Sequence, residues 1–365
     1  MKSSILTYTK AGVDYESIDP LKRLAQKAAL ETGTNSEIHE ISQSRGESAY
    51  VWEEKDCYRA IVIEGLGTKN LVADTMRKIT GKTYYDTVAQ DTVAMIVNDL
   101  LVVGARPQVV NAYFAVGSSD WFKDTKRTTD LVNGWAKACK LAGAVWGGGE
   151  TPTLSKIIAP ETIDLAGAAI GIIKPKKHLA LGDKLSAGDV IILIESNGIH
   201  ANGLTLVRAV ASKQKQGFNT KLDDGTTFGE TILKPTCIYA NVITDLFDAG
   251  IAIHYQVNIT GHGWRKLMRA QKPFTYVIEK VPETQTLFSF IQEKTQITDQ
   301  EMYATFNMGA GFAVFVDPAH SDSAIEIIKK RKFNACIAGY VEKGKKQIII
   351  LPKNIVYCSE TLRIR

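Results

Sequence analysis

The segment from Val88 to Pro107 restricts the fold of this chain more than any other. It reads VAQDTVAMIVNDLLVVGARP, and most of its residues are Val, Ala, Met, Ile or Leu, which predicts a helix buried on nearly all sides. Three polar residues, Asp91, Asn98 and Asp99, interrupt the apolar run. Burying a carboxylate costs several kcal/mol unless a partner compensates its charge. The fold must therefore bring a partner to this helix.

The spacing of the three polar residues allows two kinds of partner. Asp91 and Asn98 are two turns apart on one helix face, and Asp99 lies beside them. A rigid row of oxygen atoms is what a Mg²⁺–phosphate site requires. An internal hydrogen-bond network, with Asp86 capping the helix, satisfies the same side chains. The segment alone favours neither interpretation.

The segment EGLGTK, residues 64–69, combines glycines with charged groups after a predicted strand. Such a turn lets backbone N–H groups approach a phosphate, while Glu64 could hold a cation and Lys69 adds positive charge. A tight turn with an exposed lysine is the simpler alternative, and this segment alone favours it.

The segment GGGET, residues 147–151, also follows a predicted strand. Its glycines leave backbone donors accessible, and Glu150 and Thr151 add oxygen atoms for a metal or a phosphate. The alternative is a glycine-rich turn that permits close packing.

The segment SNGIHANG, residues 196–203, places His200 among small residues just before a predicted helix, where we expect it to be exposed. A histidine in such a turn can bind an anion or transfer a proton near neutral pH. A structural role is more common for a single loop histidine, and the same holds for His262 in ITGHG.

Helical and strand patterns alternate along both halves of the chain, which predicts an α/β fold. The predicted helices cover residues 20–30, 86–104, 125–144, 204–211, 236–250, 264–270 and 321–331. Each of the following ranges is predicted to contain one strand: 58–69, 108–117, 145–154, 163–173, 190–196, 274–279 and 305–316. Residues 336–351 are predicted to form a hairpin-like pair of strands. Residues 174–189 are rich in Pro, Gly and charge, so we predict domains at 1–175 and 186–365.

Composition excludes several classes of protein. The net charge is +5 with basic residues scattered, so no nucleic-acid-binding arm is predicted. The five cysteines are far apart and form no CxxC pair, so neither a disulfide framework nor a cysteine zinc site is indicated. No apolar run is long enough to cross a bilayer, and the start lacks the apolar core of a signal peptide. These features predict a cytoplasmic protein without a membrane or nucleic-acid partner.

The chain resembles the phosphoribosylformylglycinamidine cyclo-ligase (aminoimidazole ribonucleotide synthetase) family, the founder of the PurM-like ATP-binding superfamily. The resemblance is carried by nine segments in the order of the family: AGVD (11–14), GLGTK (65–69), DTVAMIVNDLLVVGARP (91–107), GGET (148–151), DLAGAAIG (164–171), SNGIHANGLTLVR (196–208), LKPTCIY (233–239), ITGHG (259–263) and EMYATFNMGAGF (301–312). Agreement of so many ordered segments by chance is very improbable.

The resemblance implies a reaction and a fold. ATP phosphorylates the formyl oxygen of formylglycinamidine ribonucleotide, a small-molecule substrate, and the amidine nitrogen closes the imidazole ring with release of ADP and phosphate. The implied fold is a two-domain PurM-like homodimer, with N-terminal strands in a shared barrel and a C-terminal α/β domain. The implied catalytic residues are His200, Lys69 and Asp99; the ATP-binding residues are Glu64, Gly65, Gly67, Thr68, Asp91, Asn98, Gly148, Gly149 and Thr151; and the Mg²⁺ ligands are Asp91, Asp99, Glu150 and Glu64.

The chain departs from the family pattern at several positions. Glu64 stands where the family usually has aspartate, His262 stands in place of a glycine, and Lys10 is one place from its expected position. Residues 35–50 replace a glycine-rich stretch, so the loop that covers the phosphates is expected to be altered or lost. The family is therefore better defined by the sequence than the substrate.

Sister enzymes of the superfamily fit the sequence less well. Selenophosphate synthetase needs a reactive N-terminal cysteine, whereas the first cysteine here, Cys57, lacks the glycine setting. Hydrogenase-maturation dehydratase ends in a cysteine, and Cys358 lies before the end of this chain. Thiamine-phosphate kinase has paired aspartates where EGLG stands. A non-catalytic nucleotide-binding paralogue remains an alternative from another class.

Overall fold

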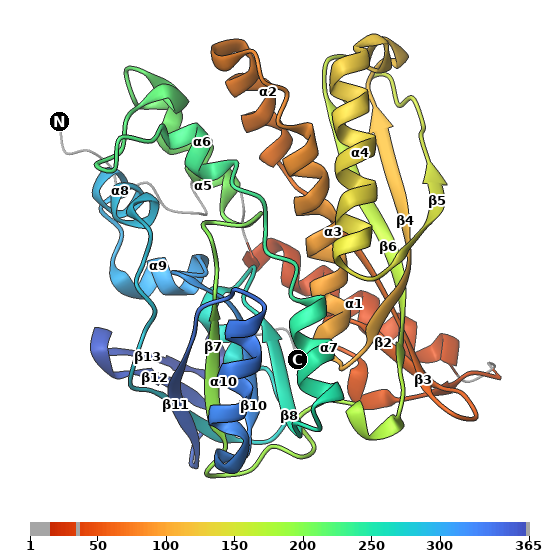
Figure 1. The fold of residues 1–365 in the computed structure, drawn as a ribbon, viewed down its shortest axis with the longest axis vertical. Helices are drawn as coiled ribbons and strands as arrows, with labels where there is room; N and C mark the ends of the chain where they lie inside the picture. Colours follow the sequence, from red (N-terminus) through yellow and green to blue (C-terminus); the bar gives the residue numbers. More distant parts are fainter. Residues whose placement is uncertain (1–14, 34–36, 363–365) are drawn as a thin grey trace.

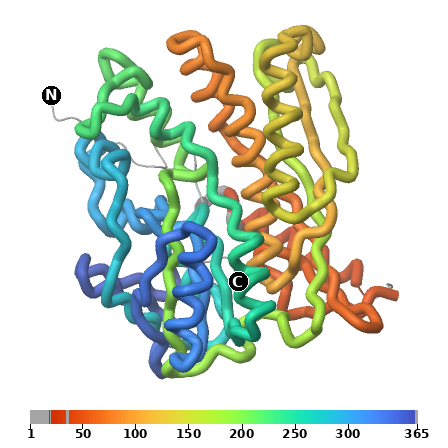
Figure 2. The backbone as a smooth tube through the Cα atoms, in the orientation of Figure 1, coloured from red at the N-terminus to blue at the C-terminus, as the bar shows by residue number. Residues whose placement is uncertain are grey.

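The computed structural model describes residues 15–33 and 37–362, and it contains two domains that each hold one sheet (Figure 1). The AGVD segment and Lys10 lie outside the described residues. The first sheet has six strands in the order β1-β2-β3-β6-β4-β5, and the second has seven in the order β13-β12-β9-β11-β7-β10-β8. Figure 2 shows the first domain, coloured red to yellow, beside the second, coloured green to blue. The α/β prediction is confirmed.

The bounds of the elements are as follows. The α-helices are α1 (Tyr15–Thr32), α2 (Lys69–Thr80), α3 (Tyr85–Val102), α4 (Thr125–Leu141), α5 (Leu204–Ser212), α6 (Phe228–Ile232), α7 (Ala240–Asp248), α8 (Thr286–Thr295), α9 (Asp299–Thr305) and α10 (Ser321–Lys330). The strands are β1 (His39–Glu40), β2 (Tyr50–Glu53), β3 (Tyr58–Gly65), β4 (Arg106–Val116), β5 (Val145–Glu150), β6 (Ile163–Ile173), β7 (Val190–Glu195), β8 (Ile253–Asn258), β9 (Phe274–Ile278), β10 (Ala310–Val316), β11 (Ala335–Lys343), β12 (Gln347–Ile350) and β13 (Ile355–Cys358).

Helix α3 is the centre of the first domain, as its apolar sequence predicts. It packs on β3, β4 and β6 and is covered by α4, and it also contacts β8 of the second domain. Successive side chains of β3 point to opposite faces of the sheet, as in any strand. Ala60 and Val62 are buried, Glu64 lies on their side, and Ile61 and Ile63 face away. This alternation directs the Glu64 carboxylate toward α3.

The face of the first sheet that lies away from α3 carries an apolar surface. Its exposed side chains are Ile61, Ile63, Val109, Val145 and Ile170, and Ile63 alone is 76% exposed. Large apolar surfaces of this kind on a soluble domain usually mark an interaction site. We call these five residues the open sheet face.

The second domain corrects one strand prediction. Residues 336–351 do not form a hairpin, because β11 and β12 lie on opposite sides of β9. β12 runs parallel to β9 and pairs antiparallel with β13 instead. Apolar alternation identified both strands, but alternation carries no information about the partner of a strand.

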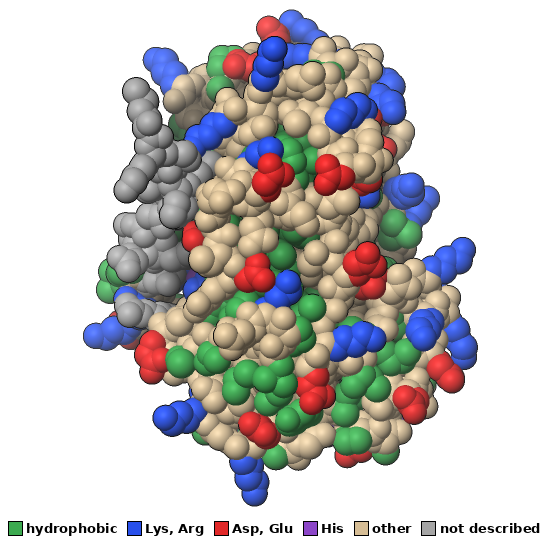
Figure 3. Space-filling model, turned by 90° about the vertical axis from the view of Figure 1, so that its left-hand side faces the viewer, with side chains coloured by type: hydrophobic (Ala, Val, Ile, Leu, Met, Phe, Trp, Pro, Cys, Tyr) green, Lys and Arg blue, Asp and Glu red, His purple; other side chains and the backbone are tan. Residues whose placement is uncertain are grey.

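The helix predictions missed several helices and assigned the wrong type to one. Helices α2, α6, α8 and α9 were not predicted, and the predicted helix 264–270 is a 3₁₀ helix, η6 (Gly263–Met268). Among the described residues no helix is both long and apolar enough to span a membrane. Acidic and basic side chains are interspersed over the face in Figure 3, in keeping with the scattered charges of the sequence.

Candidate functional site

A cavity of about 360 Å³ lies where the end of β3, the middle of α3 and the turn before η6 meet. Helix α1 and residues 46–48 complete its wall. Its charged lining residues are Lys22, Glu47, Glu64, Asp99, Lys266 and Arg269. Both domains therefore contribute charge to one cavity, and residues 46–48 belong to the stretch in which the sequence predicts an altered phosphate-covering loop.

Glu64 and Asp99 form a carboxylate pair in this cavity. Strand alternation turns Glu64 toward α3, and Asp99 lies one helical turn after Met95, which also lines the cavity. Burial, the negative charge of Asp99 and a hydrogen bond with it raise the pKa of Glu64 to about 7. A buried carboxyl group beside a second carboxylate favours a bound cation.

Lys266 supplies a positive charge that lowers the pKa of Glu64 and so opposes the effect of Asp99. Its Nζ donates to the Asn258 carbonyl at 3.1 Å and to Thr260 Oγ1 at 2.5 Å. Asn258 Nδ2 in turn donates to Asp99 Oδ1 at 2.7 Å. Burial lowers the pKa of Lys266 to about 8, although the Asp99 charge opposes this shift. A lysine ammonium has three N–H groups, so one donor remains for a ligand.

Arg269 is fixed at the other side of the cavity. Its Nη1 donates to Ser48 Oγ at 2.9 Å, and its Nε lies 3.8 Å from Glu47 Oε2. Tyr255 donates from its hydroxyl to Glu47 Oε1 at 3.2 Å. These contacts hold a guanidinium, which suits bidentate binding of phosphate, at a defined place in the wall.

His262 lines the same cavity with an unusual backbone conformation. Its φ is +69°, a left-handed backbone conformation that residues other than glycine seldom adopt. The side chain is only 8% exposed. Burial, together with the charges of Arg265 and Lys266, lowers the pKa of His262 to about 3, so the ring is neutral at pH 7. The turn ITGHG therefore places a neutral imidazole beside Lys266.

Asp91 and Lys69 form a fully buried ion pair away from this cavity. Lys69 Nζ lies 2.8 Å from Asp91 Oδ1, and both side chains are 0% exposed. The ammonium also donates to the carbonyls of His200 and Lys234, at 2.8 and 2.9 Å. Burial raises the pKa of Asp91 and lowers that of Lys69. The lysine is neither exposed nor placed to contact a phosphate in this cavity.

The polar row of α3 holds a segment of the second domain. Asp91 Oδ1 accepts from Thr236 N at 2.7 Å and from Thr236 Oγ1 at 2.5 Å. Asn98 donates to the Cys237 carbonyl at 2.8 Å and accepts from Tyr239 N at 3.1 Å. Of the three polar residues in the row, the cavity wall contains Asp99 and neither of the other two. For Asp91 and Asn98, the contacts therefore agree with the interpretation of this helix as part of an internal hydrogen-bond network.

The expectation that His200 is exposed is wrong. The side chain is 1% exposed, and its ring lies 6.4 Å from the ring of Tyr239. A Cβ added to Gly311 would lie 2.6 Å from His200 Cε1, so the strand β10 backbone covers the ring. Burial lowers the pKa of His200 to about 3. The neighbouring Asn202, rather than His200, reaches the cavity.

Glu150 lies far from Glu64 within one chain. Glu64 is in register with Gly167, Gly167 with Ala112, and Ala112 with Gly149. Three strand spacings therefore separate the two sites, about 14 Å. Glu150 is exposed and accepts a hydrogen bond from Thr151 N at 3.1 Å.

The glycines of GGGET have a packing role. A Cβ on Gly149 would lie 2.2 Å from the Ala112 carbonyl oxygen, so β5 could not approach β4. At Gly148 nothing lies within 4 Å of an added Cβ, and its φ is +127°. Close packing, the alternative interpretation of this segment, accounts for Gly149.

The turn after β3 leads from Glu64 into α2. Gly65 and Gly67 are exposed, and the φ of Gly67 is +73°. Thr68 Oγ1 is buried and has no hydrogen-bond partner among the described residues. A buried hydroxyl without a partner is a group that a ligand or an ion could satisfy.

The structure thus unites only part of the predicted site. Within the described residues, no three His, Cys, Asp or Glu side chains come together as a metal-binding group. Glu64 and Asp99 share the cavity, whereas the other predicted residues, namely Gly65, Gly67, Thr68, Lys69, Asp91, Asn98, Gly148, Gly149, Glu150, Thr151 and His200, are not in its wall. The residues that sequence analysis missed are Lys266, Arg269, Glu47 and Asn258; only the nearby ITGHG segment pointed to them.

The sequence matches two parts of one family. Residues 46–173 match the N-terminal domain, and residues 186–352 match the C-terminal domain, of the family described as AIR synthase related protein. A phosphoribosylformylglycinamidine cyclo-ligase of Methanocaldococcus jannaschii is 35% identical over 92% of this chain and 92% of that protein. One of Caldicellulosiruptor saccharolyticus is 35% identical over 94% of this chain and 99% of that protein.

Solved structures share the fold at low identity. The HypE-HypF complex has a TM-score of 0.62 at 18% identity, covering 91% of this chain and 97% of that chain. Thermotoga maritima PurL complexed with AMPPCP has a TM-score of 0.57 at 14% identity, covering 89% of this chain and 48% of that chain. These likenesses establish the PurM-like fold, as predicted.

Proposed function

Since the chain belongs to the AIR synthase related protein family, we propose that it catalyses the ATP-dependent cyclisation of formylglycinamidine ribonucleotide to aminoimidazole ribonucleotide. ATP transfers its γ-phosphoryl group to the formyl oxygen, the amidine nitrogen attacks the formyl carbon, and phosphate leaves. The products are the ribonucleotide, ADP and phosphate, a step of purine biosynthesis. The similarity to cyclo-ligases over nearly the whole chain supports this assignment.

The observation that carries the proposal is the carboxylate pair of Glu64 and Asp99 in a cavity that also holds Lys266 and Arg269. The pair fits Mg²⁺, because hard oxygen ligands suit this ion and because burial and the neighbouring Asp99 charge raise the pKa of Glu64. A Mg²⁺ ion bound by Glu64 and Asp99 would supply positive charge beside the phosphates of ATP.

Lys266 and Arg269 have a separate role in the proposal. The remaining N–H donor of Lys266 and the fixed guanidinium of Arg269 bind phosphate oxygens and stabilise the charge that develops during transfer. Asn258 orients Asp99 through its 2.7 Å hydrogen bond. Phosphoryl transfer depends on positioning and charge more than on covalent help, so this set of side chains is suited to it.

The catalytic roles of Lys69 and His200 remain predictions. We propose that both are positioning residues, because Lys69 donates to the carbonyl of His200 and both side chains are enclosed. Through this contact Lys69 holds the turn that carries Asn202 into the cavity. The predicted ATP contacts of Gly65, Gly67 and Thr68 also stay in the proposal, supported by the unpartnered Thr68 hydroxyl.

The remaining parts of the proposal concern the oligomeric state, the domain boundaries and the location of the protein in the cell. The open sheet face supports a homodimer with a shared barrel, in which a partner would cover Ile61 and Ile63. The two sheets support the division into residues 1–175 and 186–365. All five cysteines are free thiols, which supports the cytoplasm as the location.

The test is substrate-dependent ADP release. We expect the purified protein to release ADP and form aminoimidazole ribonucleotide only when formylglycinamidine ribonucleotide, ATP and Mg²⁺ are all present. Asp99→Asn should lower turnover by about 100-fold or more, since it removes a charge that Mg²⁺ requires. ATP binding without turnover for this substrate would favour the non-catalytic paralogue instead.

A further inference from the structure

A second cavity, of about 900 Å³, lies between the two domains and shares no lining residue with the cavity around Glu64. One wall is α2, from Leu71 to Ile79. The opposite wall is the end of α5 and the turn that follows it, up to Phe218. Arg127 of α4 also lines the cavity.

The two walls are joined at their base by a contact described above. Helix α2 begins at Lys69, whose Nζ donates to the carbonyl of His200 at 2.8 Å, just before α5. Helix α2 also contacts α6 and the 3₁₀ helix η5 (Gly217–Asn219), and a Cβ added to Gly229 of α6 would lie 2.2 Å from Met76 Sδ of α2. The cavity therefore lies between two walls that are fixed to each other at more than one point.

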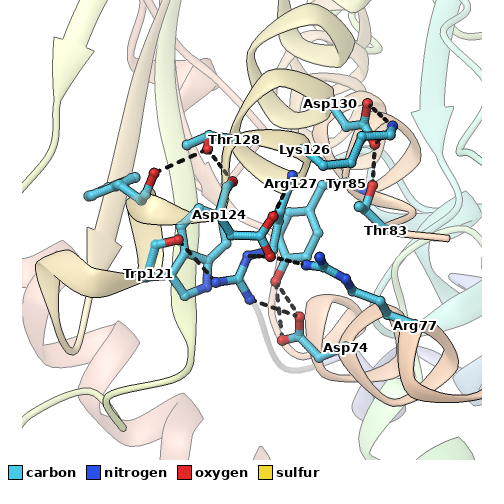
Figure 4. A network of polar contacts seen from close by, with 11 residues as sticks. Asp74, Arg77, Thr83, Tyr85, Trp121, Asp124, Lys126, Arg127, Thr128 and Asp130 are labelled. Carbon is cyan, nitrogen blue, oxygen red and sulfur yellow. Dashed lines mark hydrogen bonds and ion pairs between the residues drawn. The ribbon is translucent and has the colours of Figure 1, made fainter. Parts of the chain in front are cut away.

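Two arginines of the lining, Arg77 and Arg127, belong to a network of ion pairs (Figure 4). Arg127 lies 3.9 Å above the ring of Trp121 and forms an ion pair with Asp74 at 3.7 Å. Arg77 forms an ion pair with Asp124. The two guanidinium groups and the two carboxylates of this network thus balance one another in charge.

The opposite wall carries a charge that is not balanced in this way. Arg208 of α5 is half-buried in the cavity, and no described residue gives its side chain a hydrogen bond or an ion pair. Lys78, on the wall formed by α2, is exposed and likewise has no such partner within the described residues. Glu161, itself exposed, is the remaining carboxylate of the lining. A half-buried guanidinium without a partner favours an anion that accepts from it bidentately, as phosphate does.

The cavity also offers apolar surface to such an anion. Leu71 and Ile79 contribute it from α2, and Ala211 and Phe218 from the other wall. Its volume is in the range of sites for small organic ligands. We propose that this cavity binds an organic phosphate of nucleotide size, with the phosphate on Arg208 and the apolar part between Leu71 and Phe218. This site is independent of the catalytic cavity.

Calorimetric titration with AMP as the probe tests the proposal, with EDTA present so that no Mg²⁺ supports binding at Glu64 and Asp99. We expect one AMP to bind per chain, more tightly than inorganic phosphate or adenosine. Arg208→Gln should weaken binding at least tenfold, which corresponds to about 1.4 kcal/mol. Thr75→Trp, at an exposed lining position, should fill the cavity and abolish binding.

Two variants serve as controls. Lys213→Gln removes a nearby exposed charge that does not line the cavity, and Asp99→Asn alters the other cavity. Both should bind AMP like the wild type. The proposal is overturned if the wild type does not bind AMP, if phosphate or adenosine binds equally well, or if Arg208→Gln and Thr75→Trp bind normally. Loss of binding in Asp99→Asn would also overturn it. Because no substrate or Mg²⁺ is used, none of these results depends on the cyclo-ligase activity.

Discussion

The side chains of Glu64 and Asp99 behave as one electrostatic unit. Burial, and after it the negative charge of Asp99, raises the pKa of Glu64 to about 7. A cation between them would remove the repulsion and favour the ionised form of Glu64. Glu64 is longer than the aspartate that the family resemblance leads us to expect at this position, and it forms a hydrogen bond with Asp99.

Glu64 variants separate charge from length. Glu64→Asp should remain active with at most a modest change in Mg²⁺ dependence, because a carboxylate is retained. Glu64→Gln should lower kcat/KM by about 100-fold, the usual cost of one electrostatic contact to the transition state. Mg²⁺ titrations of turnover measure both effects. Wild-type activity in both variants would show that Glu64 does not contact the metal.

Two buried histidines make stability depend on pH. The pKa values of His200 and His262 are about 3 in the folded protein, whereas the ordinary value is 6.5. Between these values the unfolded chain binds more protons, so the free energy of unfolding falls as pH drops from 6.5 toward 3. Each histidine contributes a slope of up to about 1.4 kcal/mol per pH unit.

His262→Asn tests that slope, because Asn tolerates the left-handed conformation and does not titrate. We expect urea unfolding at pH 5 and pH 7 to differ less in this variant than in the wild type. The control is His39→Asn, which replaces an exposed histidine and should leave the difference unchanged. An unchanged pH dependence in His262→Asn would show that the ring is not buried in a neutral form.

Helix α3 serves both domains through its polar row. Asp91 and Asn98 bind residues 236–239 of the second domain, whereas Asp99 faces the cavity around Glu64. One helix therefore positions the cavity and fixes the domain that forms its other wall. This dual role explains why an otherwise apolar helix contains three polar side chains.

Substitutions along α3 should separate these roles. Asp91→Asn leaves Lys69 buried without a countercharge, and breaking a buried ion pair costs about 3–5 kcal/mol. Asn98→Ala should cost about 1–3 kcal/mol, since it leaves buried backbone groups unpaired. Denaturant unfolding measures both losses, and Asp86→Asn at an exposed position of the same helix is the control. Near-wild-type stability of Asp91→Asn, with weakened Mg²⁺ binding, would return Asp91 to the metal site.

Sequence patterns predicted the local features of α3 but not its partners. Burial of the helix followed from its apolar residues, and the need to compensate Asp91, Asn98 and Asp99 followed from their charge and polarity. Which side chain would face a cavity depended on where residues 234–239 pack, and that is a tertiary contact. Lys266 and Arg269 were missed for the same reason, because a scattered basic residue carries no periodic signal.

At the scale of the whole molecule, the open sheet face is an apolar surface that no part of the described chain covers. The sheet has helices on one face, and the other face exposes Ile61, Ile63 and Val109. Dimerisation through this face would remove apolar surface from water and stabilise the assembly. The predicted shared barrel requires such a contact.

Ile63→Lys should therefore shift the protein from dimer to monomer in sedimentation velocity experiments. A charge at the centre of an apolar interface loses its water without gaining a partner. Leu351→Lys, at an exposed apolar position of the second domain, should leave the sedimentation coefficient unchanged. A wild-type protein that is monomeric at micromolar concentration would contradict the shared barrel.

The most direct test of the proposed reaction follows the formyl oxygen. Formylglycinamidine ribonucleotide labelled with ¹⁸O at the formyl group is incubated with the enzyme, ATP and Mg²⁺, and the released phosphate is analysed by mass spectrometry. If ATP phosphorylates that oxygen before ring closure, each phosphate released carries one ¹⁸O atom, in step with aminoimidazole ribonucleotide formation. Unlabelled phosphate, or ADP release without ring closure, would contradict the assignment.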